Sequence, residues 1–147
     1  MDAFRTMTLH HRAIQDAVAS LTCHGLLTRF PTLKVMLIEN GAEWVPHVLD
    51  NLADTYLKMP QLFEEDPVAA FKRNVYVAPF HEDDVEGLAQ MIGVDHILFG
   101  SDWPHPEGLG QPRSYIERLS RSFAPDDVAR IMGTNVADLL SVASVAA

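Results

Sequence analysis

Three short apolar runs separated by amphipathic segments constrain the fold of this chain more than any other feature. The runs cover residues 34–39, 74–79 and 96–100. They contain β-branched residues and end at Gly, Pro or Asn–Gly turn signals, a pattern typical of buried strands. Strands that alternate with helices predict a parallel sheet with right-handed crossovers. We therefore expect an α/β fold.

The segments between these runs have the apolar spacing of helices. Asp83 followed by Glu86 resembles a capping box, and Gly93 predicts the end of the same helix. Pro125 suits a first helical position. Cys23 lies inside a helical stretch, where we expect a small buried residue. The predicted helices cover residues 7–27, 43–58, 67–73, 83–92, 112–122, 125–132 and 134–142.

The length of the chain sets a limit on this architecture. Its 147 residues suffice for one domain with a core, but a complete (β/α)8 barrel takes about 250 residues. Three parallel strands leave unpaired backbone groups at both edges of their sheet. We therefore expect residues 1–147 to form a single partial domain that pairs with copies of itself or belongs to a larger fold.

Composition excludes several classes of function. Hydrophobic residues make up 48% and charged residues 21%, which is typical of a globular protein. The net charge of −9 disfavours binding to nucleic acid or anionic membranes. The single cysteine rules out an internal disulfide and suits a reducing compartment. No apolar run approaches the roughly 20 residues of a membrane span, and none resembles a signal peptide, so we expect a cytoplasmic protein.

The segment from Ile97 to Pro106 is the strongest candidate for a functional site, because an apolar strand leads directly to Asp102 and His105. Parallel strands end at the same edge, so Glu39, His81 and Asp102 are expected to gather there. Carboxylates and imidazoles that converge can bind a divalent cation. Asp102 could ligate the metal or accept a proton from its bound water, and His105 could donate a proton or bind a substrate oxygen.

Trp44 and Trp103 could form the walls of an apolar substrate pocket. Structural alternatives exist for every candidate. Asp102 could cap a helix, Glu39 could belong to a turn, and His105 could lie in water between two prolines. His81 stands beside acidic residues, as in an exposed loop. No nucleophile elbow, phosphate loop or dinucleotide-binding glycine motif occurs.

Several segments together resemble the amidohydrolase-related family of metal-dependent hydrolases and decarboxylases, which includes aminocarboxymuconate semialdehyde decarboxylase. The matching segments are 30–35, 38–46, 74–77, 97–105 and 133–140. Gly-Ser-Asp-Trp-Pro-His at 100–105 is the most specific of them, and the order of the segments strengthens the match. The resemblance extends from about Gly25 to Leu140.

The resemblance implies a distorted (β/α)8 barrel, of which this chain is the C-terminal portion with about three strands and their helices. In complete members a divalent metal, with zinc the leading candidate, is held by a His-x-His pair, a further histidine and the aspartate that matches Asp102. This sequence contains no His-x-His. Where the decarboxylase branch has a catalytic histidine, this chain has Glu39. Of the metal ligands, Asp102 alone carries over.

We therefore expect the C-terminal fragment of a metal-dependent hydrolase or carboxy-lyase that acts on a small organic acid, amide or lactone-like substrate. Asp102 would be the metal ligand or proton acceptor, and His105 and Glu39 would contact substrate. The fragment would be inactive without an N-terminal half or a second copy that supplies the remaining ligands. The alternatives are a non-catalytic remnant that self-associates and a small-molecule binding module without chemistry.

Overall fold

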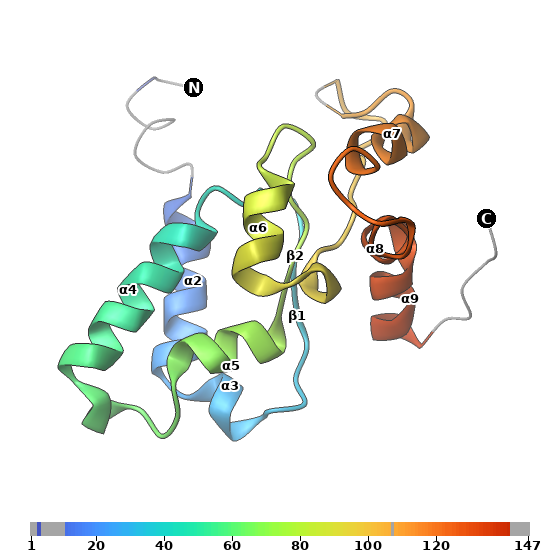
Figure 1. The fold of residues 1–147 in the computed structure, drawn as a ribbon. Coiled ribbons are helices and arrows are strands. Elements are labelled where there is room, and N and C mark those ends of the chain that lie inside the picture. The colour runs from blue at the N-terminus through green and yellow to red at the C-terminus, as the bar shows by residue number, and fades with distance from the viewer. Residues whose placement is uncertain (1–2, 4–10, 107, 142–147) are drawn as a thin grey trace. The chain divides into compact units, whose positions relative to one another are not determined.

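The computed structural model describes residues 3, 11–106 and 108–141 of this chain. Helices dominate a mixed α/β fold (Figure 1). The chain divides into two compact units, residues 1–35 with 43–75 and residues 36–42 with 76–147. None of the helices in the described ranges has both the length and the apolar character that crossing a bilayer requires.

The first unit is built from helices. They are α2 (Arg12–Cys23), α3 (Leu26–Arg29), α4 (Val45–Lys58), the 3-10 turn η1 (Pro60–Leu62) and α5 (Pro67–Asn74). The long helix predicted for residues 7–27 is therefore interrupted, because Gly25 has a φ of 71° that ends α2 before α3 begins. The predicted residues 7–10 lie outside the described ranges.

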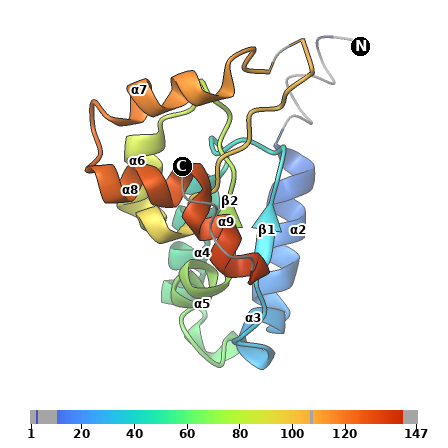
Figure 2. The same cartoon turned by 90° about the vertical axis from the view of Figure 1, so that its right-hand side faces the viewer.

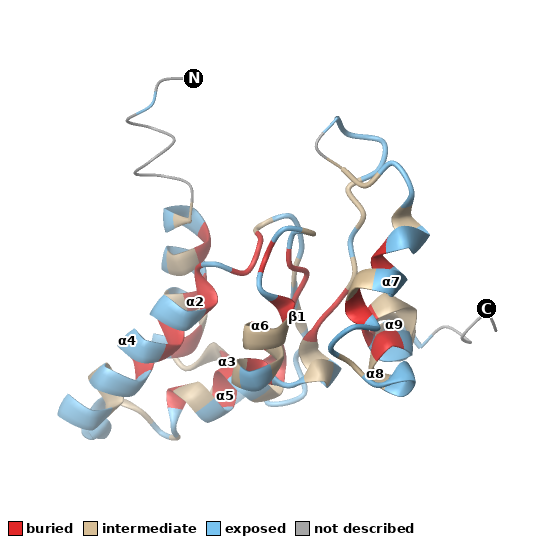
Figure 3. Ribbon diagram, turned by 45° about the horizontal axis from the view of Figure 1, so that its top comes forward, coloured by how far each residue is buried: buried red, intermediate tan, exposed pale blue. Residues whose placement is uncertain are grey.

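The core of the first unit lies where α2, α4 and α5 pack together. Each helix turns its apolar stripe inward, so α4 is exposed on one side and buried on the other (Figure 3). Trp44 is 1% exposed and packs edge-on against Phe71, with ring centroids 6.3 Å apart. Among the described residues of this unit, the other fully buried apolar side chains are Val18, Leu27, Val45, Ala70 and Val75.

Two polar residues of α5 hold the connections of this unit. Arg73 binds Glu65 through both carboxylate oxygens, at 2.7 and 2.8 Å, and also donates to the carbonyl of Leu27. Asn74 is fully buried and donates to the carbonyl of Leu33 at 2.7 Å. These bonds satisfy loop carbonyl groups that would otherwise lose their hydrogen-bond partners.

The second unit contains the sheet residues and the C-terminal helices (Figure 2). Strands β1 (Val35–Leu37) and β2 (Val75–Val77) pair, and each contributes its last two residues to this unit. The helical elements are α6 (Val85–Ile92), η2 (Val94–His96), η3 (Pro112–Ser114), α7 (Tyr115–Leu119), α8 (Pro125–Ala129), the π-helical turn η4 (Arg130–Thr134) and α9 (Asn135–Leu140).

The third predicted strand is shorter than expected. Residues 94–96 form a 3-10 turn, and Ile97 makes a single parallel bridge to Val77. The Leu98 N–H donates to the Val77 carbonyl at 2.9 Å. At Ile97 the chain therefore runs parallel to β2, as predicted, but it pairs through a single bridge and forms no strand. β1 is also less buried than expected, since Met36 is 39% exposed.

The core of the second unit surrounds Tyr76, Ala78 and Leu98, against which Val136 and Leu139 of α9 pack. Asn135, at the start of α9, is 4% exposed and donates to the carbonyl groups of Val94 and Ile97, at 2.8 Å each. This side chain fixes α9 against the segment that leads toward Asp102.

Two further local predictions are wrong. Asp84, not Asp83, caps α6, because its side chain accepts from the Gly87 N–H at 2.9 Å. Cys23 is exposed, whereas Thr22 beside it is buried and bonds the Val18 carbonyl. Ile14 and Val18 are buried as the periodicity predicts, and only the last turn of α2 differs, where Thr22 is buried instead of its neighbours. The predicted end of α6 at Gly93 is confirmed.

Candidate functional site

Asp102 lies in a tightly closed loop of the second unit. Its backbone has a φ of 53°, in the left-handed region that L-residues other than Asn, Asp and Gly rarely adopt. The His105 N–H donates to the Asp102 carbonyl at 2.9 Å, and the Leu109 N–H donates to the Ser101 carbonyl at 2.8 Å. The loop thus turns back on itself and fixes the backbone that carries the Asp102 side chain.

Gly108 permits this closure. A Cβ atom at position 108 would collide with the backbone carbonyl group of Asp102 and lie 2.9 Å from the Ser101 oxygen. The close approach of two backbone segments requires a residue without a side chain.

His105 lies beside Asp102 in this loop. Its Nδ1 lies 3.6 Å from Oδ1 of Asp102, too far for a hydrogen bond but close enough for an ion pair when the imidazole is protonated. The Asp102 side chain is 24% exposed and that of His105 is 61% exposed. Both groups are therefore accessible to a ligand.

Glu39 follows β1 and also has a left-handed backbone, with a φ of 58°. Its side chain is exposed. Asn40 beside it donates to the Ile38 carbonyl at 2.7 Å, which stabilises the turn. Glu39, Asp102 and Ser141 are the residues other than glycine with positive φ in the described part of the chain. Two of these three are the carboxylates predicted from sequence to form the site.

Asp83 connects the loops that follow the two strands. One of its carboxylate oxygens accepts from the Ala42 N–H at 2.7 Å and from the Phe80 N–H at 2.8 Å. The side chain is 8% exposed. Gly41 passes so close to Phe80 that a Cβ atom would lie 2.8 Å from its ring. The loop that carries Glu39 and the loop that carries His81 are thus fastened together, as expected for strand ends at one edge.

The structure extends this connection to α7. Arg118 donates to the Asp83 carbonyl at 2.8 Å. Tyr115 stacks on Phe99, three residues before Asp102, with ring centroids 5.3 Å apart. Burial raises the pKa of the Tyr115 hydroxyl above its ordinary value, although Arg118 over the ring opposes this. Sequence reasoning missed Asp83 and Tyr115. The adjacent aspartates Asp83 and Asp84 could have indicated this role, because only one of them can cap α6 and the other is then free to bind elsewhere.

The remaining candidates occupy different surroundings. His81 lies 3.0 Å from Glu82, consistent with the loop alternative considered for it. Trp103 is 65% exposed. Trp44 belongs to the core of the first unit, so its predicted role beside Trp103 stays a prediction.

The His, Cys, Asp and Glu side chains of the described residues do not form a complete site for a divalent metal. Within residues 3, 11–106 and 108–141, no three His, Cys, Asp or Glu side chains converge as a metal site requires. Asp102 and His105 could supply one carboxylate and one imidazole ligand, but a catalytic metal needs about three protein ligands. The described residues therefore do not hold such a metal by themselves.

Comparison with known proteins gives the family. The amidohydrolase family model matches residues 6–142, and the chain belongs to this family. An amidohydrolase from Mycobacterium avium subsp. paratuberculosis is 46% identical, with a TM-score of 0.90. The match covers 95% of this chain and 36% of that one.

Two decarboxylases share the fold at lower identity. Dihydroxybenzoic acid decarboxylase from Polaromonas sp. JS666, solved with manganese and 2-nitroresorcinol, has a TM-score of 0.70 and 22% identity. The match covers 89% of this chain and 40% of that chain. For 5-carboxyvanillate decarboxylase from Sphingomonas paucimobilis the TM-score is 0.67, the identity 22%, and the coverage 86% and 38%. This chain thus spans between about a third and two fifths of these proteins.

Proposed function

We propose that this chain supplies the C-terminal strands and helices of an amidohydrolase-type (β/α)8 barrel, and that residues 1–147 form one partial domain of it. In this proposal the catalytic site is completed by residues from outside this chain. The reaction is that of a metal-dependent hydrolase or carboxy-lyase on a small organic substrate. The chain alone is inactive, because the described residues offer too few metal ligands.

The observation that carries this proposal is the left-handed backbone of Asp102 in a loop closed by hydrogen bonds. Backbone strain of this kind costs of order 1–3 kcal/mol and gathers at functional sites, where the surrounding structure holds it. Asp102 also lies after a parallel bridge residue, where barrel enzymes present their catalytic groups.

Within this proposal each candidate residue keeps a definite role. Asp102 would supply one metal ligand or accept a proton, and His105, 3.6 Å away, would donate a proton or contact substrate. Glu39 would face substrate from the loop after β1. Trp103 would provide apolar contacts. The metal is divalent, and zinc remains our first candidate. The single cysteine supports a cytoplasmic location.

Complementation tests the proposal. The part of the Mycobacterium avium amidohydrolase outside the matched region would be expressed separately and mixed with this chain. We expect the mixture to bind manganese or zinc with a stoichiometry that neither part reaches alone. Asp102→Asn should abolish this gain, whereas Asp95→Asn, which removes an exposed carboxylate paired with Arg130, should leave it intact. A stable complex that gains no metal would contradict the proposal.

A second candidate function is self-association without catalysis. Among the described residues β1 pairs with β2 alone, so its other edge has no strand beside it. Met36 and Ile38 on this segment are 39% and 50% exposed. An open, apolar strand edge favours pairing with another chain. Sedimentation analysis separates the two candidates: a stable homo-oligomer that is disrupted by Ile38→Lys supports self-association, and a monomer removes it.

A further inference from the structure

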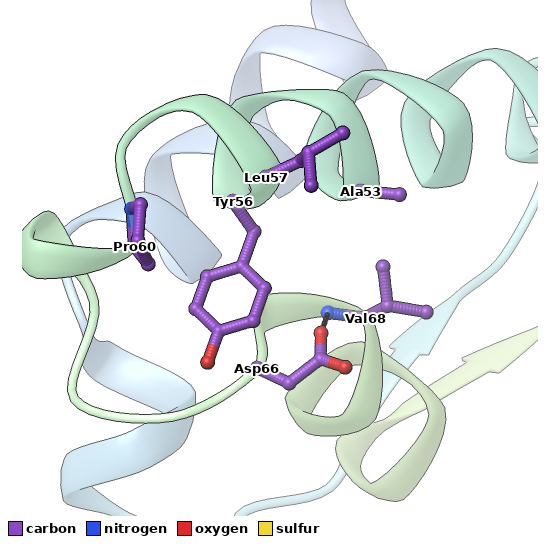
Figure 4. A pocket seen from close by; sticks show the side chains of 6 residues that line it. All are labelled: Ala53, Tyr56, Leu57, Pro60, Asp66 and Val68. Carbon is purple, nitrogen blue, oxygen red and sulfur yellow. Dashed lines mark hydrogen bonds between the residues drawn. The ribbon is translucent and has the colours of Figure 1, made fainter.

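The first unit contains a groove whose lining residues are not part of the candidate site described above. It has a volume of about 560 Å³ and lies between the C-terminal half of α4 and the start of α5 (Figure 4). Pockets that bind small molecules have volumes of about 300–1,000 Å³. The residues that line it are Ala53, Tyr56, Leu57, Pro60, Asp66 and Val68.

The walls of the groove are mostly apolar. Leu57 is 81% exposed, more than any other large apolar residue of the described ranges, and Met59 and Leu62 nearby are 40% and 64% exposed. Single exposed apolar residues are ordinary, but three within six residues, of which Leu57 lines the groove, form a patch. This surface gains free energy when an apolar ligand displaces its water.

Two polar groups reach the groove, and both have fixed orientations. The ring of Tyr56 packs edge-on against Phe63, with centroids 5.7 Å apart and planes at 87°. One carboxylate oxygen of Asp66 accepts from the Val68 N–H at 2.8 Å, which caps α5. No further hydrogen bond or ion pair to Asp66 occurs in the described part of the chain. Its second oxygen is therefore available to a ligand.

We propose that this groove binds small apolar molecules that carry one ammonium group. The apolar walls take the hydrocarbon body, and the free oxygen of Asp66 accepts from the ammonium, with the hydroxyl of Tyr56 as a second acceptor. None of the six lining residues carries a positive charge. The start of a helix normally attracts anions, but the Asp66 carboxylate already occupies that position at α5. Charge therefore favours a cation over an anion here.

Benzylammonium, benzyl alcohol and benzoate test the assignment, because they share a ring and differ in charge. Each would be titrated into the ¹⁵N-labelled full chain while amide shifts are recorded. We expect benzylammonium to shift the amides of residues 53–57 and 66–68. Benzyl alcohol should bind more weakly and benzoate weakest. Added salt should narrow these differences, since the discriminating contact is an exposed charge pair.

Asp66→Asn isolates the charge. Asparagine caps helices as well as aspartate, so the stability of α5 should be kept while benzylammonium affinity falls about two- to fivefold, the range of exposed ion pairs. Asp54→Asn is the matched control, because Asp54 lies on α4 outside the groove and pairs with Lys58. Ala53→Phe should fill the groove and abolish binding of all three probes.

The proposal would be overturned by equal affinity for benzylammonium and benzoate, by an unchanged affinity in Asp66→Asn, or by shifts located away from the groove. Equal binding of benzylammonium and benzyl alcohol would also overturn it, since the groove would then be apolar without charge selectivity. The proposal does not depend on the proposed catalytic role, because the groove involves neither Asp102 nor Glu39.

Discussion

At the scale of the single residue, the φ of 53° at Asp102 allows substitutions that change the stability of the fold to be distinguished from those that change only the carboxylate. A left-handed backbone costs an ordinary L-residue roughly 1–2 kcal/mol, and aspartate and asparagine less. We predict that Asp102→Asn is neutral for stability, that Asp102→Val lowers the free energy of unfolding by about 1–2 kcal/mol, and that Asp102→Gly leaves it unchanged or raises it. Urea unfolding of the three variants measures this.

A clear loss of stability in Asp102→Gly would contradict this account, because it would mean that the side chain and not the backbone holds the loop. Glu39, with a φ of 58°, provides an independent comparison. Glu39→Gly should behave as Asp102→Gly does.

Gly108 supports the same loop through its missing side chain. Gly108→Ala places a Cβ against the Asp102 carbonyl group, so the loop must open or shift. We expect a loss of about 1–3 kcal/mol, the usual range for overpacking, together with a change in the chemical shifts of His105. Gly110→Ala is the control, since nothing lies within 4 Å of a Cβ there. If both variants unfold at the same temperature, Gly108 has no special role.

At the scale of the elements, Asp83 fastens the loop after β1 to the loop after β2. Asp83→Ala leaves two backbone N–H groups without their acceptor, which costs about 1–3 kcal/mol for a buried group. Asp83→Asn keeps an acceptor oxygen and should cost less. Hydrogen exchange at Ala42 and Phe80 should accelerate in Asp83→Ala. Unchanged exchange at both amides would show that other contacts hold these loops.

The Glu65–Arg73 pair should make the first unit sensitive to acid. The hydrogen bonds from Arg73 lower the pKa of Glu65 from 4.5 to about 2. Because the folded pKa is the lower one, the pair stabilises the fold fully above pH 4.5, and this contribution is lost as the pH falls toward 2. Glu65→Gln should therefore be less stable than the natural chain at pH 6 and equally stable near pH 2.

Urea titrations at several pH values measure this convergence. Glu64→Gln serves as the control, because the neighbouring Glu64 is exposed and Arg73 pairs with Glu65 instead. A constant difference between Glu65→Gln and the natural chain from pH 6 to pH 2 would mean that the ion pair does not titrate in this range.

Element positions could be predicted from sequence where periodicity and turn residues agree. The strand at Val75–Val77 and the helix at Val45–Lys58 lie within their predicted ranges. The predictions of local structure are wrong where the sequence allows two arrangements. Asp83 and Asp84 can both cap α6, and the outcome depends on loops that are distant in sequence. The strand expected at 96–100 is reduced to a bridge, because residues 94–96 form a 3-10 turn.

At the scale of the whole molecule, the family could be predicted from short motifs, since the amidohydrolase model matches residues 6–142. The site residues were predicted from the ends of the strands, and they stay predictions; the structure shows that Asp83 joins the loop of Glu39 to the loop of His81. What sequence could not provide is the placement of Asp83, whose contacts with Ala42 and Arg118 span 41 and 35 positions. The stacking of Tyr115 on Phe99 was equally out of its reach.

The metal content of the purified, folded chain tests the central claim most directly. The account predicts that elemental analysis after exposure to zinc or manganese finds no stoichiometric metal, because Asp102 lacks two further protein ligands among the described residues. Near-stoichiometric metal that is bound by the monomeric chain and disappears in Asp102→Asn would contradict the account, since it would mean that this chain assembles a complete site by itself.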